Sequence, residues 1–568
     1  MEQGTKKITG AEALLHSLIE EGVDTIFGYP GGTIMPLYDK LYDFHGRLNH
    51  ILVRHEQGAV HAAEGYARTT GKVGVCMATA GPGATNTVTG IADAFIDSTP
   101  LVCITAQVPS DNLGTNFFQE ADTISITIPV TKWSYQITNA GEVAEIMAKA
   151  FHIARSGRPG PVLISFPKHA QVEMTDYRYK KFRQPKKAAP NGNPDTDTRI
   201  AQAVGLLNAA RRPMIIFGQG IMIAGAEKEL VRLAERGNIP MASTLMGISA
   251  VPSGHPLLAG NVGMHGNLAP NRMTQESDVI LAIGMRFSDR VTGDIPKYAP
   301  KAKIIHVDID RAELNKIVKV YLPIQGDARD ILRAMIPAIE RRQREDWMDF
   351  IAAQKAEEQE TVIRGTLDRL SGCISMGSAV AAVARAGNGN AIIVTDVGQH
   401  QMFSARYSRF NKTRSLITSG GLGTMGFGLP AAIGAKIGRP DREVVAIMGD
   451  GGFQMSIQEL GTVMQSGIAL KMVVLNNSFL GMVRQWQQLF FGRRYSHTEM
   501  ANPDFTAIAS AYGIPAARVA EYPDLEAGIK KMMAHKGPYF LEVICEKEEN
   551  VFPMIPSGAS LDDILLNG

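Results

Sequence analysis

The chain has only four cysteines in 568 residues, Cys76, Cys103, Cys373 and Cys545, and they lie far apart in the sequence. This spacing excludes a dense disulfide framework and a Cys-x-x-Cys metal or redox motif. Scattered cysteines of this kind are typical of reduced, mostly buried thiols in a cytoplasmic protein.

The sequence also lacks an excess of charge of one sign. Its 58 basic and 56 acidic side chains give a formal net charge of +2, so bulk electrostatics offers no attraction to nucleic acid or to a membrane surface. No apolar run reaches the roughly 20 residues that a membrane-spanning helix needs. Near the N-terminus, Thr9 and Glu12 predict a helix capping box where a signal peptide would have its apolar segment. We therefore expect a mature, cytoplasmic protein with no nucleic-acid and no membrane partner.

Short apolar runs rich in β-branched residues, such as 214–217, 279–283 and 303–307, alternate with helical segments. This alternation predicts parallel sheets covered by helices, and the length predicts about three domains. Polar stretches near 180–194 and 341–360 predict a linker and a charged, solvated connecting helix. The expected fold class is α/β, with three doubly wound domains at 1–185, 190–345 and 370–550 and a C-terminal tail at 551–568.

Glycines and hard-metal ligands follow two predicted strands near the C-terminus. Gly449, Asp450 and Gly451 follow one apolar run, and Asn477 follows the next, at 471–475. The carboxyl ends of parallel strands meet at one edge of a sheet, where glycines allow the backbone to approach phosphate. Carboxylate and amide oxygens suit Mg²⁺ that shares its ligands with a diphosphate. The alternative is two turns without chemical consequence.

Gly-Asp-Gly followed about two dozen residues later by Asn-Asn resembles the fingerprint of the thiamine-diphosphate (ThDP) enzymes. Further segments, in order along nearly the whole chain, resemble the catalytic large subunits of the acetohydroxyacid synthase (acetolactate synthase) family. They are 27–32, 54–57, 81–86, 118–122, 157–161, 285–293, 398–402 and 481–486. The resemblance implies a pyrimidine-binding, a central FAD-binding and a diphosphate-binding domain, the first and last of one fold. It implies the cofactors ThDP, Mg²⁺ and FAD.

The resemblance also implies functional roles for individual residues. The catalytic residues would be Glu56, Gly32, Gln119 and Lys168, and Glu56 would hydrogen-bond the ThDP aminopyrimidine. The other implied residues are Arg290, Trp486 and Met482 for substrate; Gln399, His400, Met425, Gly449, Gly451 and Phe479 for ThDP; and Asp450, Asn477 and the Phe479 main-chain carbonyl for the metal. The FAD site would contain Arg158, Gly218, Gly220, His265, Arg286, Asp308 and Asp327.

Taken singly, most of these residues have simpler interpretations. Glu56 could be an acid in a first helical turn, Met425 a core side chain, and Lys168 a solvated surface group. Gly218 and Gly220 do not begin a full Gly-x-Gly-x-x-Gly, because Ile223 occupies the last position. The joint occurrence of these residues in matching segments is what favours the family interpretation.

The implied activity is ThDP-dependent decarboxylation of pyruvate and transfer of the two-carbon unit to pyruvate or 2-oxobutyrate. The products, 2-acetolactate and 2-aceto-2-hydroxybutyrate, would serve branched-chain amino-acid (valine, leucine, isoleucine) biosynthesis. The implied assembly is a homodimer or homotetramer with active sites at the subunit interface, and a small regulatory subunit is a further candidate partner. Alternatives are an FAD-independent catabolic acetolactate synthase, another ThDP-dependent 2-oxoacid decarboxylase, a binding protein without turnover, and an NAD-binding protein.

The sequence departs from the family pattern at a few positions. Ser288 stands where an acid is usual, Gly452 where serine is common, and His169 where an aspartate follows the lysine. Lys168 and Arg290 are retained, so we expect the chemistry to be retained. FAD affinity and acceptor preference are the properties that these changes would alter.

Overall fold

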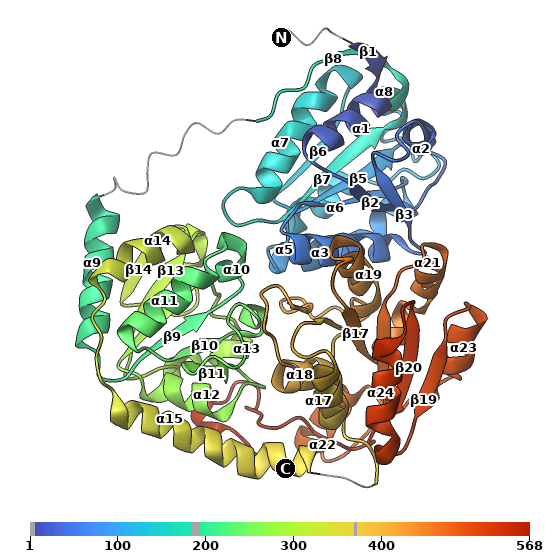
Figure 1. The fold of residues 1–568 in the computed structure, drawn as a ribbon. Coiled ribbons are helices and arrows are strands. Elements are labelled where there is room, and N and C mark those ends of the chain that lie inside the picture. The colour runs from blue at the N-terminus through green and yellow to red at the C-terminus, as the bar shows by residue number, and fades with distance from the viewer. Residues whose placement is uncertain (1–5, 183–193, 369–371, 568) are drawn as a thin grey trace.

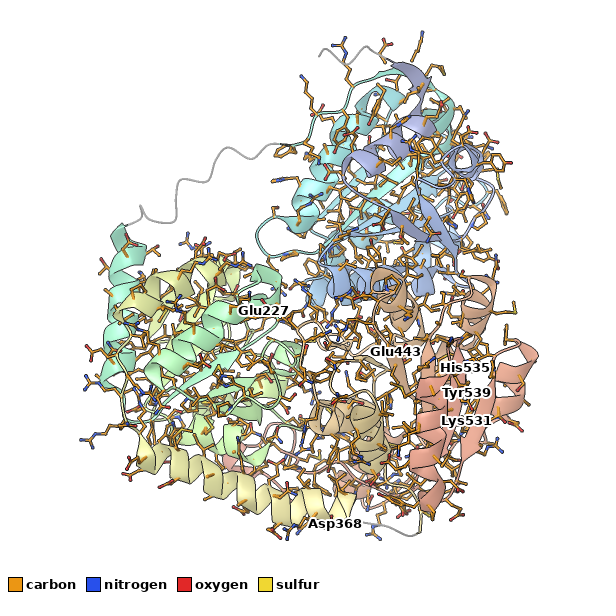
Figure 2. The ribbon with its side chains drawn as sticks, viewed as in Figure 1. Glu227, Asp368, Glu443, Lys531, His535 and Tyr539 are labelled. Atoms are coloured by element: carbon orange, nitrogen blue, oxygen red, sulfur yellow. The ribbon has the colours of Figure 1, made fainter. Side chains whose placement is uncertain are left out.

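The computed structural model describes residues 6–182, 194–368 and 372–567. Three six-stranded parallel sheets each form the centre of one domain, as predicted, and β1 and β8 add a small antiparallel sheet. The three domains lie around a common centre, and side chains fill the space between their ribbons (Figures 1 and 2). Most of the predicted linker, residues 183–193, lies outside the described residues.

The N-terminal domain has the strand order β3-β2-β4-β5-β7-β6. The Thr9 side chain and Glu12 form the predicted capping box at the start of the first helix. The strands are β1 (Lys6–Thr9), β2 (Thr25–Gly28), β3 (Asn49–Leu52), β4 (Gly74–Ala78), β5 (Leu101–Gln107), β6 (Trp133–Gln136), β7 (Pro161–Pro167) and β8 (Met174–Tyr177). The helices are α1 (Gly10–Glu20), α2 (Met35–Tyr42), α3 (Glu56–Thr70), α4 (Pro82–Thr85), α5 (Val88–Ile96), α6 (Thr123–Thr127), α7 (Val143–Arg155) and α8 (Lys168–Val172).

The middle domain has a different strand order, β11-β10-β9-β12-β13-β14. Numbered within the domain this is 3-2-1-4-5-6, the order of dinucleotide-binding sheets, in which the strand order reverses between the first and fourth strands. The strands are β9 (Pro213–Phe217), β10 (Met241–Ser243), β11 (Leu258–Asn261), β12 (Val279–Ile283), β13 (Lys303–Asp308) and β14 (Leu322–Gln325). The helices are α9 (Pro194–Ala209), α10 (Gly220–Ala224), α11 (Glu227–Gly237), α12 (Leu268–Glu276), α13 (Asp289–Thr292) and α14 (Ala328–Met335).

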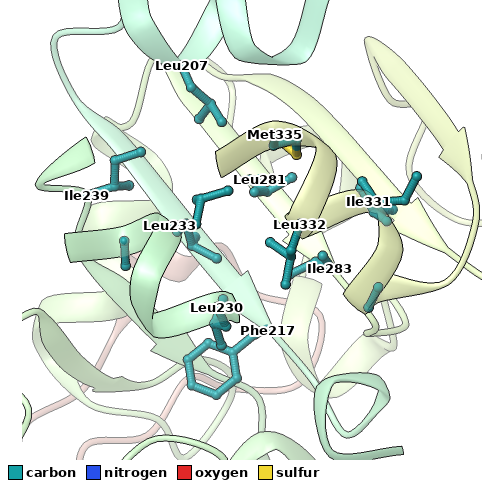
Figure 3. Close-up of a cluster of buried hydrophobic side chains, with 14 of the residues drawn as sticks. Leu207, Phe217, Leu230, Leu233, Ile239, Leu281, Ile283, Ile331, Leu332 and Met335 are labelled. Atoms are coloured by element: carbon teal, nitrogen blue, oxygen red, sulfur yellow. The ribbon is translucent and has the colours of Figure 1, made fainter. Parts of the chain in front are cut away.

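The core of the middle domain illustrates what holds each sheet to its helices. Leu207, Leu233, Leu281 and Leu332 are fully buried between the sheet and the helices on one face (Figure 3). Full burial of one such side chain stabilises the fold by about 1.5–3 kcal/mol. Separate clusters of buried side chains on both faces of the sheets fix the strands whose ends carry the loops.

The C-terminal domain has the strand order β16-β15-β17-β18-β20-β19, which repeats the order of the N-terminal domain. The outer domains therefore share one topology, as expected. The strands are β15 (Ile392–Thr395), β16 (Leu416–Ile417), β17 (Val444–Gly449), β18 (Lys471–Asn476), β19 (Ala516–Val519) and β20 (Tyr539–Ile544). The helices are α17 (Met376–Ala386), α18 (Gln399–Tyr407), α19 (Gly428–Gly438), α20 (Asp450–Met455), α21 (Leu460–Gln465), α22 (Gly481–Phe490), α23 (Phe505–Ala511) and α24 (Leu525–Ala534).

The predicted connecting helix is present as α15 (Glu345–Glu358), which a π-turn joins to α16 (Arg364–Leu367). It was expected to be solvated, but one side packs on the middle domain. Trp347 is buried and its indole N–H donates to the Pro213 carbonyl at 2.9 Å. Glu358 is also buried and pairs with Arg406 of the C-terminal domain. The helix therefore contributes to the packing of two domains (Figure 1).

Small residues bring the two outer domains into close contact. Helices α3 and α19 cross so tightly that a Cβ at Gly65 would lie 1.9 Å from the Ala431 carbonyl oxygen, and one at Gly434 would lie 1.7 Å from that of Ala62. Only glycine allows backbones to approach this closely.

Within the described residues, no helix is both long and apolar enough to cross a membrane. Three of the four cysteines are buried, as expected, while Cys373 is exposed.

Candidate active site

Glu56 begins α3, at the carboxyl edge of the N-terminal sheet. The His55 side chain caps the helix by accepting from the backbone N–H of Gln57 at 3.1 Å. The Glu56 carboxylate is buried and accepts from the Asn86 amide at 2.9 Å. Burial and the nearby Glu56 charge raise the pKa of Tyr38. Glu56 is thus a fixed, largely dehydrated acceptor.

The other three predicted catalytic residues lie at the same edge. Gly32 follows β2, Gln119 follows β5 and Lys168 begins α8 directly after β7. A Cβ at Gly81, in the turn after β4, would lie 2.9 Å from the Gln119 carbonyl oxygen, so Gln119 packs against this turn. The Gln171 amide on α8 donates to the Thr33 carbonyl at 3.0 Å and ties the Lys168 helix to the Gly32 loop. The fold therefore gathers the four residues.

Asp450 and Asn477 lie at the carboxyl edge of the C-terminal sheet. Strands β17 and β18 are neighbours, with Gly449 in register with Leu475. The Asn502 amide donates to Asp450 at 2.7 Å and to the Asn476 side chain at 2.9 Å, which places the two strand ends together. Asn477 accepts from the backbone N–H of Phe479 at 3.3 Å.

The environment of Asp450 fits a cation. Burial raises the pKa of Asp450 to about 6. Its hydrogen-bond donors are the neutral Asn502 amide and backbone N–H groups. A buried carboxylate with neutral donors is stabilised by a positive partner, and Asp450 with Asn477 offers the oxygen ligands that Mg²⁺ takes.

Gln399 and His400 begin α18 beside these predicted metal ligands. The Gln399 carbonyl oxygen lies 3.5 Å from the Asn477 amide nitrogen. His400 packs against Gly449, where an added Cβ would lie 2.8 Å from its Nδ1. Burial lowers the pKa of His400 to about 3, and its Nε2 is buried without a hydrogen-bond partner. A phosphate oxygen at the start of α18 would satisfy that atom and interact with the helix dipole.

Met425 lies close to the turn that carries Gly449 and Gly451. Its terminal methyl lies 3.7 Å from the position of a Cβ at Gly451. It also lines a cavity of about 1010 Å³ that all three domains enclose. The edge of the C-terminal domain predicted to bind the diphosphate therefore adjoins this cavity through Met425.

All seven residues predicted for FAD line the cavity: Arg158, Gly218, Gly220, His265, Arg286, Asp308 and Asp327. Gly218 and Gly220 follow β9 at the point where the strand order of the middle sheet reverses, between β9 and β12. Added Cβ atoms there would lie 2.4 Å and 2.6 Å from backbone atoms of Gly284. His265 Nδ1 is buried without a partner, and burial lowers the pKa of His265 to about 3. Volume, position and this unpaired atom fit a dinucleotide.

The predicted substrate residues Arg290, Met482 and Trp486 also line the cavity, whereas Gly32, Glu56, Gln119 and Lys168 do not. Arg290 is exposed and lies near Met264, with 3.3 Å between its guanidinium and the sulfur. Trp486 on α22 is half-buried. The predicted residues thus form two groups within one chain, one at the N-terminal edge and one around the cavity.

The C-terminal tail connects helix α22 of the C-terminal domain to the middle domain. Val551 exchanges backbone hydrogen bonds with the Gln485 side chain, next to Trp486. Ile555 donates to the carbonyl of Met264, which lines the cavity. The tail therefore holds α22 against the middle domain.

Sequence reasoning missed several polar residues around the predicted ones. Asn502 had no motif around it, and Asn86 stood in the segment 81–86 without an assigned partner. Asp93, Asp97 and Ser419 join the outer domains through contacts between residues more than 300 positions apart. A single sequence gives no signal for such pairs.

Three family models match the chain in order. They describe the N-terminal TPP (thiamine pyrophosphate) binding domain at residues 8–126, the central domain at 200–335 and the C-terminal TPP binding domain at 396–543 of thiamine pyrophosphate enzymes.

Curated relatives match over nearly the full length of both chains. The acetolactate synthase isozyme 2 large subunit of Escherichia coli (strain K12) is 44% identical over 560 residues, 98% of this chain and 99% of its own. The acetolactate synthase large subunit of Corynebacterium glutamicum is 44% identical over 98% of this chain and 90% of its own. That of Lactococcus lactis is 42% identical over 99% and 96%. The chain therefore belongs to the thiamine pyrophosphate enzymes and, within them, to the acetolactate synthase large subunits.

Proposed function

We propose that the chain is a catalytic subunit that decarboxylates pyruvate and joins the two-carbon unit to a second 2-oxoacid. With pyruvate the product is 2-acetolactate, and with 2-oxobutyrate it is 2-aceto-2-hydroxybutyrate, for valine, leucine and isoleucine biosynthesis. The observation that carries the proposal is one cavity that joins Met425, Met482 and Trp486 of the C-terminal domain to a middle domain with the strand order typical of dinucleotide-binding sheets.

The two TPP-binding family models make ThDP the cofactor of this function. Gln399, His400, Gly449 and Gly451 would hold its diphosphate, and Mg²⁺ would bind Asp450, Asn477 and the Phe479 carbonyl. Bound ThDP supplies the electron sink for decarboxylation. The buried Glu56 carboxyl would hold a proton toward the cofactor's aminopyrimidine, and Met425 would fix the cofactor's bend.

In the reaction, the carboxylate of the first pyruvate leaves as CO₂ and its bonding electrons stay with the former carbonyl carbon. That carbon then forms a bond to the carbonyl carbon of the second 2-oxoacid, whose oxygen takes up a proton. Arg290 and Lys168 supply cations for substrate carboxylates, and Gln119 supplies a donor to the developing alkoxide. Gly32 leaves room for the substrate, and Met482 and Trp486 form the apolar wall for the acceptor.

FAD would occupy the middle-domain end of the cavity, held by the seven residues from Arg158 to Asp327 described above. The strand order, the cavity volume and the unpaired His265 nitrogen support this cofactor. An FAD-independent acetolactate synthase would not need such a cavity.

A homodimer, or a homotetramer built from it, would bring together the two groups of site residues. Exposed apolar side chains flank both groups: Phe117 and Phe118 adjoin Gln119, and Leu422 adjoins the cavity. Phe118 is 80% exposed and Leu422 47%, and large exposed apolar side chains next to a site favour coverage by another chain. A second copy would cover both with its opposite group.

Two further features concern partners and location. The relatives are named as large subunits, which supports a small regulatory subunit as a further partner. Cys76 and Cys103 are free and adjacent in register on β4 and β5, which supports a reducing, cytoplasmic location.

The test is a competition assay with ThDP, Mg²⁺ and FAD in which pyruvate and 2-oxobutyrate are supplied together. We expect both acetohydroxy acids, a preference for 2-aceto-2-hydroxybutyrate, and loss of activity when FAD is removed. Acetolactate formation indifferent to FAD would contradict the flavin assignment. Acetaldehyde without either acetohydroxy acid would contradict the proposed carboligation.

A further inference from the structure

The loop 419–428 of the C-terminal domain forms part of the cavity wall and carries Met425. It runs from the end of β16 to the start of α19, at the face where α3 and α5 of the N-terminal domain pack (Figure 1). Buried aspartate side chains hold the loop on both sides of Met425, and they come from different domains.

Asp97, just beyond α5, holds the first part of the loop. Its Oδ2 accepts from the backbone N–H of Gly420 at 2.9 Å and its Oδ1 from that of Gly421 at 2.8 Å. A Cβ at Gly421 would lie 2.8 Å from Asp97 Oδ1, so glycine is required for this approach. Arg68 of α3 lies 3.7 Å from Asp97 and donates to the Thr418 carbonyl at 2.5 Å. Each carboxylate oxygen therefore serves one loop amide.

Asp93, one turn earlier on α5, acts through Ser419. The Ser419 hydroxyl donates to Asp93 Oδ1 at 2.6 Å. The Ser419 hydroxyl oxygen in turn accepts from the backbone N–H groups of Gly423 at 3.1 Å and Thr424 at 2.9 Å. Asp93 is fully buried, beside His61 and Glu64. The N-terminal domain thus fixes the backbone up to the residue before Met425.

Asp396 of the C-terminal domain holds the part of the loop that follows Met425. It is buried and accepts from the N–H groups of Gly426 at 3.1 Å and Gly428 at 2.8 Å. Met425 therefore lies between two fixed parts of the loop. The part before it is hydrogen-bonded to the N-terminal domain, directly and through Ser419, and the part after it to Asp396 of its own domain.

The end of α5 also contacts the flavin side of the cavity. The Arg158 guanidinium donates to the Ser98 hydroxyl at 2.8 Å and to the Ile96 carbonyl at 3.3 Å. The residues on either side of Asp97 thus bind a predicted FAD residue, while Asp97 itself binds the loop of Met425. One short segment contacts both cofactor regions.

We propose that Asp93 and Asp97 are positioning residues that hold the loop 419–428, and Met425 with it, in the place that ThDP requires. Neither residue contacts the reacting atoms. The proposal rests on the proposed function for its consequence in turnover, but the hold on the loop is a property of the protein alone.

The variant that tests the proposal is Asp97→Asn. The two loop amides use separate oxygens, so an asparagine must turn its NH₂ group toward one of them and lose that hydrogen bond. The matched control is Asp278→Asn in the middle domain, where one carboxylate likewise accepts from two consecutive backbone N–H groups, those of Arg211 at 2.7 Å and Arg212 at 3.0 Å.

Amide hydrogen exchange of the cofactor-free protein, read by mass spectrometry over 419–428, gives the first readout. Titration calorimetry with ThDP in the presence of Mg²⁺ gives the second, and kcat and KM for pyruvate the third. For Asp97→Asn we expect exchange in the loop and the Kd of ThDP to rise about tenfold each. The kcat should fall by a similar factor while KM changes little, and Asp278→Asn should match the wild type in all three.

If amide exchange in the loop of Asp97→Asn equals that of the wild type, Asp97 does not restrain the loop and the proposal is contradicted. Faster exchange with wild-type ThDP affinity and turnover would overturn the positioning role. If Asp97→Asn does not fold, Ser419→Ala tests the same proposal, because it removes the Asp93 connection without burying a new group. It should raise exchange and the Kd of ThDP in the same direction. A wild-type protein without carboligase activity would contradict the proposed function and leave the exchange comparison valid.

Discussion

The N-terminal and C-terminal domains share one strand order, and both place their predicted functional residues at the carboxyl edge of the sheet. The chemistry at the two edges differs. The N-terminal edge holds an acid, an amide and an exposed lysine around an open glycine, and the C-terminal edge holds the buried side chains predicted to bind a metal and an unpaired histidine nitrogen. Function therefore lies in the loops that a common topology carries.

The difference also concerns what each edge can do alone. The C-terminal edge should bind the cofactor and metal without help from the N-terminal residues, whereas the N-terminal edge should act only on a cofactor held elsewhere. Mutations at the two edges should therefore separate cofactor binding from turnover.

The largest effect is expected for Asp450→Ala. Loss of the only carboxylate in the predicted metal set should abolish Mg²⁺-dependent ThDP binding and lower activity on the order of 10³-fold or more. Calorimetry and turnover both measure it, with the exposed Asp504→Ala as control. Retained tight ThDP binding would remove Asp450 from the metal site.

Glu56→Gln should sharpen the comparison, because it should lower kcat by about 10²–10⁴-fold while ThDP still binds. A glutamine keeps the shape and the contact with Asn86 but cannot hold the proton. The exposed Glu20→Gln is the control. Undiminished turnover, or a loss of ThDP binding as large as that of Asp450→Ala, would contradict the division between the edges.

Trp486→Leu should change specificity more than rate. A smaller apolar wall should lower the preference for 2-oxobutyrate over pyruvate by about tenfold, within the 1–3 kcal/mol that one apolar contact can contribute. Tyr42→Leu is the control, because Tyr42 is an exposed aromatic residue on α2 that does not line the cavity. An unchanged ratio of the two products would remove Trp486 from the acceptor pocket.

The smallest effect is on stability and concerns Asp93. Burial, and then the charges of Glu64 and Asp97, raise the pKa of Asp93 to about 8 from its ordinary value of 3.8. The folded protein therefore keeps this proton where the unfolded chain has lost it, so stability should fall as pH rises from about 4 to about 8. In Asp93→Asn the fall in thermal midpoint between pH 5 and pH 8 should be smaller. An equal fall in both proteins would contradict the raised pKa.

Local motifs made much of the site predictable. Gly449, Asp450 and Asn477 follow strands whose parallel register brings them together, and the capping box at Thr9 requires only neighbours in sequence. The dinucleotide-type strand order of the middle domain could not be derived from its incomplete glycine motif, because strand order depends on packing of the whole sheet.

The contacts between domains were the part that the sequence could not predict. Asp97 meets Gly420 because α3 and α19 cross closely, and nothing in either segment identifies the other. The interpretation of residues 341–360 as a solvated helix was only partly right for the same reason: most side chains of α15 are exposed, but Trp347 is buried against the middle domain. Charge along a helix indicates exposure only when no other domain covers it.

The most direct test of the proposed assembly uses the two inactive variants together. If each site combines the N-terminal edge of one copy with the C-terminal edge of the other, a hybrid dimer of Glu56→Gln and Asp450→Ala contains one intact site. Co-expression should then restore about a quarter of wild-type acetohydroxy acid formation, because half of the randomly formed dimers are hybrids with one intact site in two. Complete inactivity of isolated hybrid dimers would contradict the shared site and place both edges in a site within one chain.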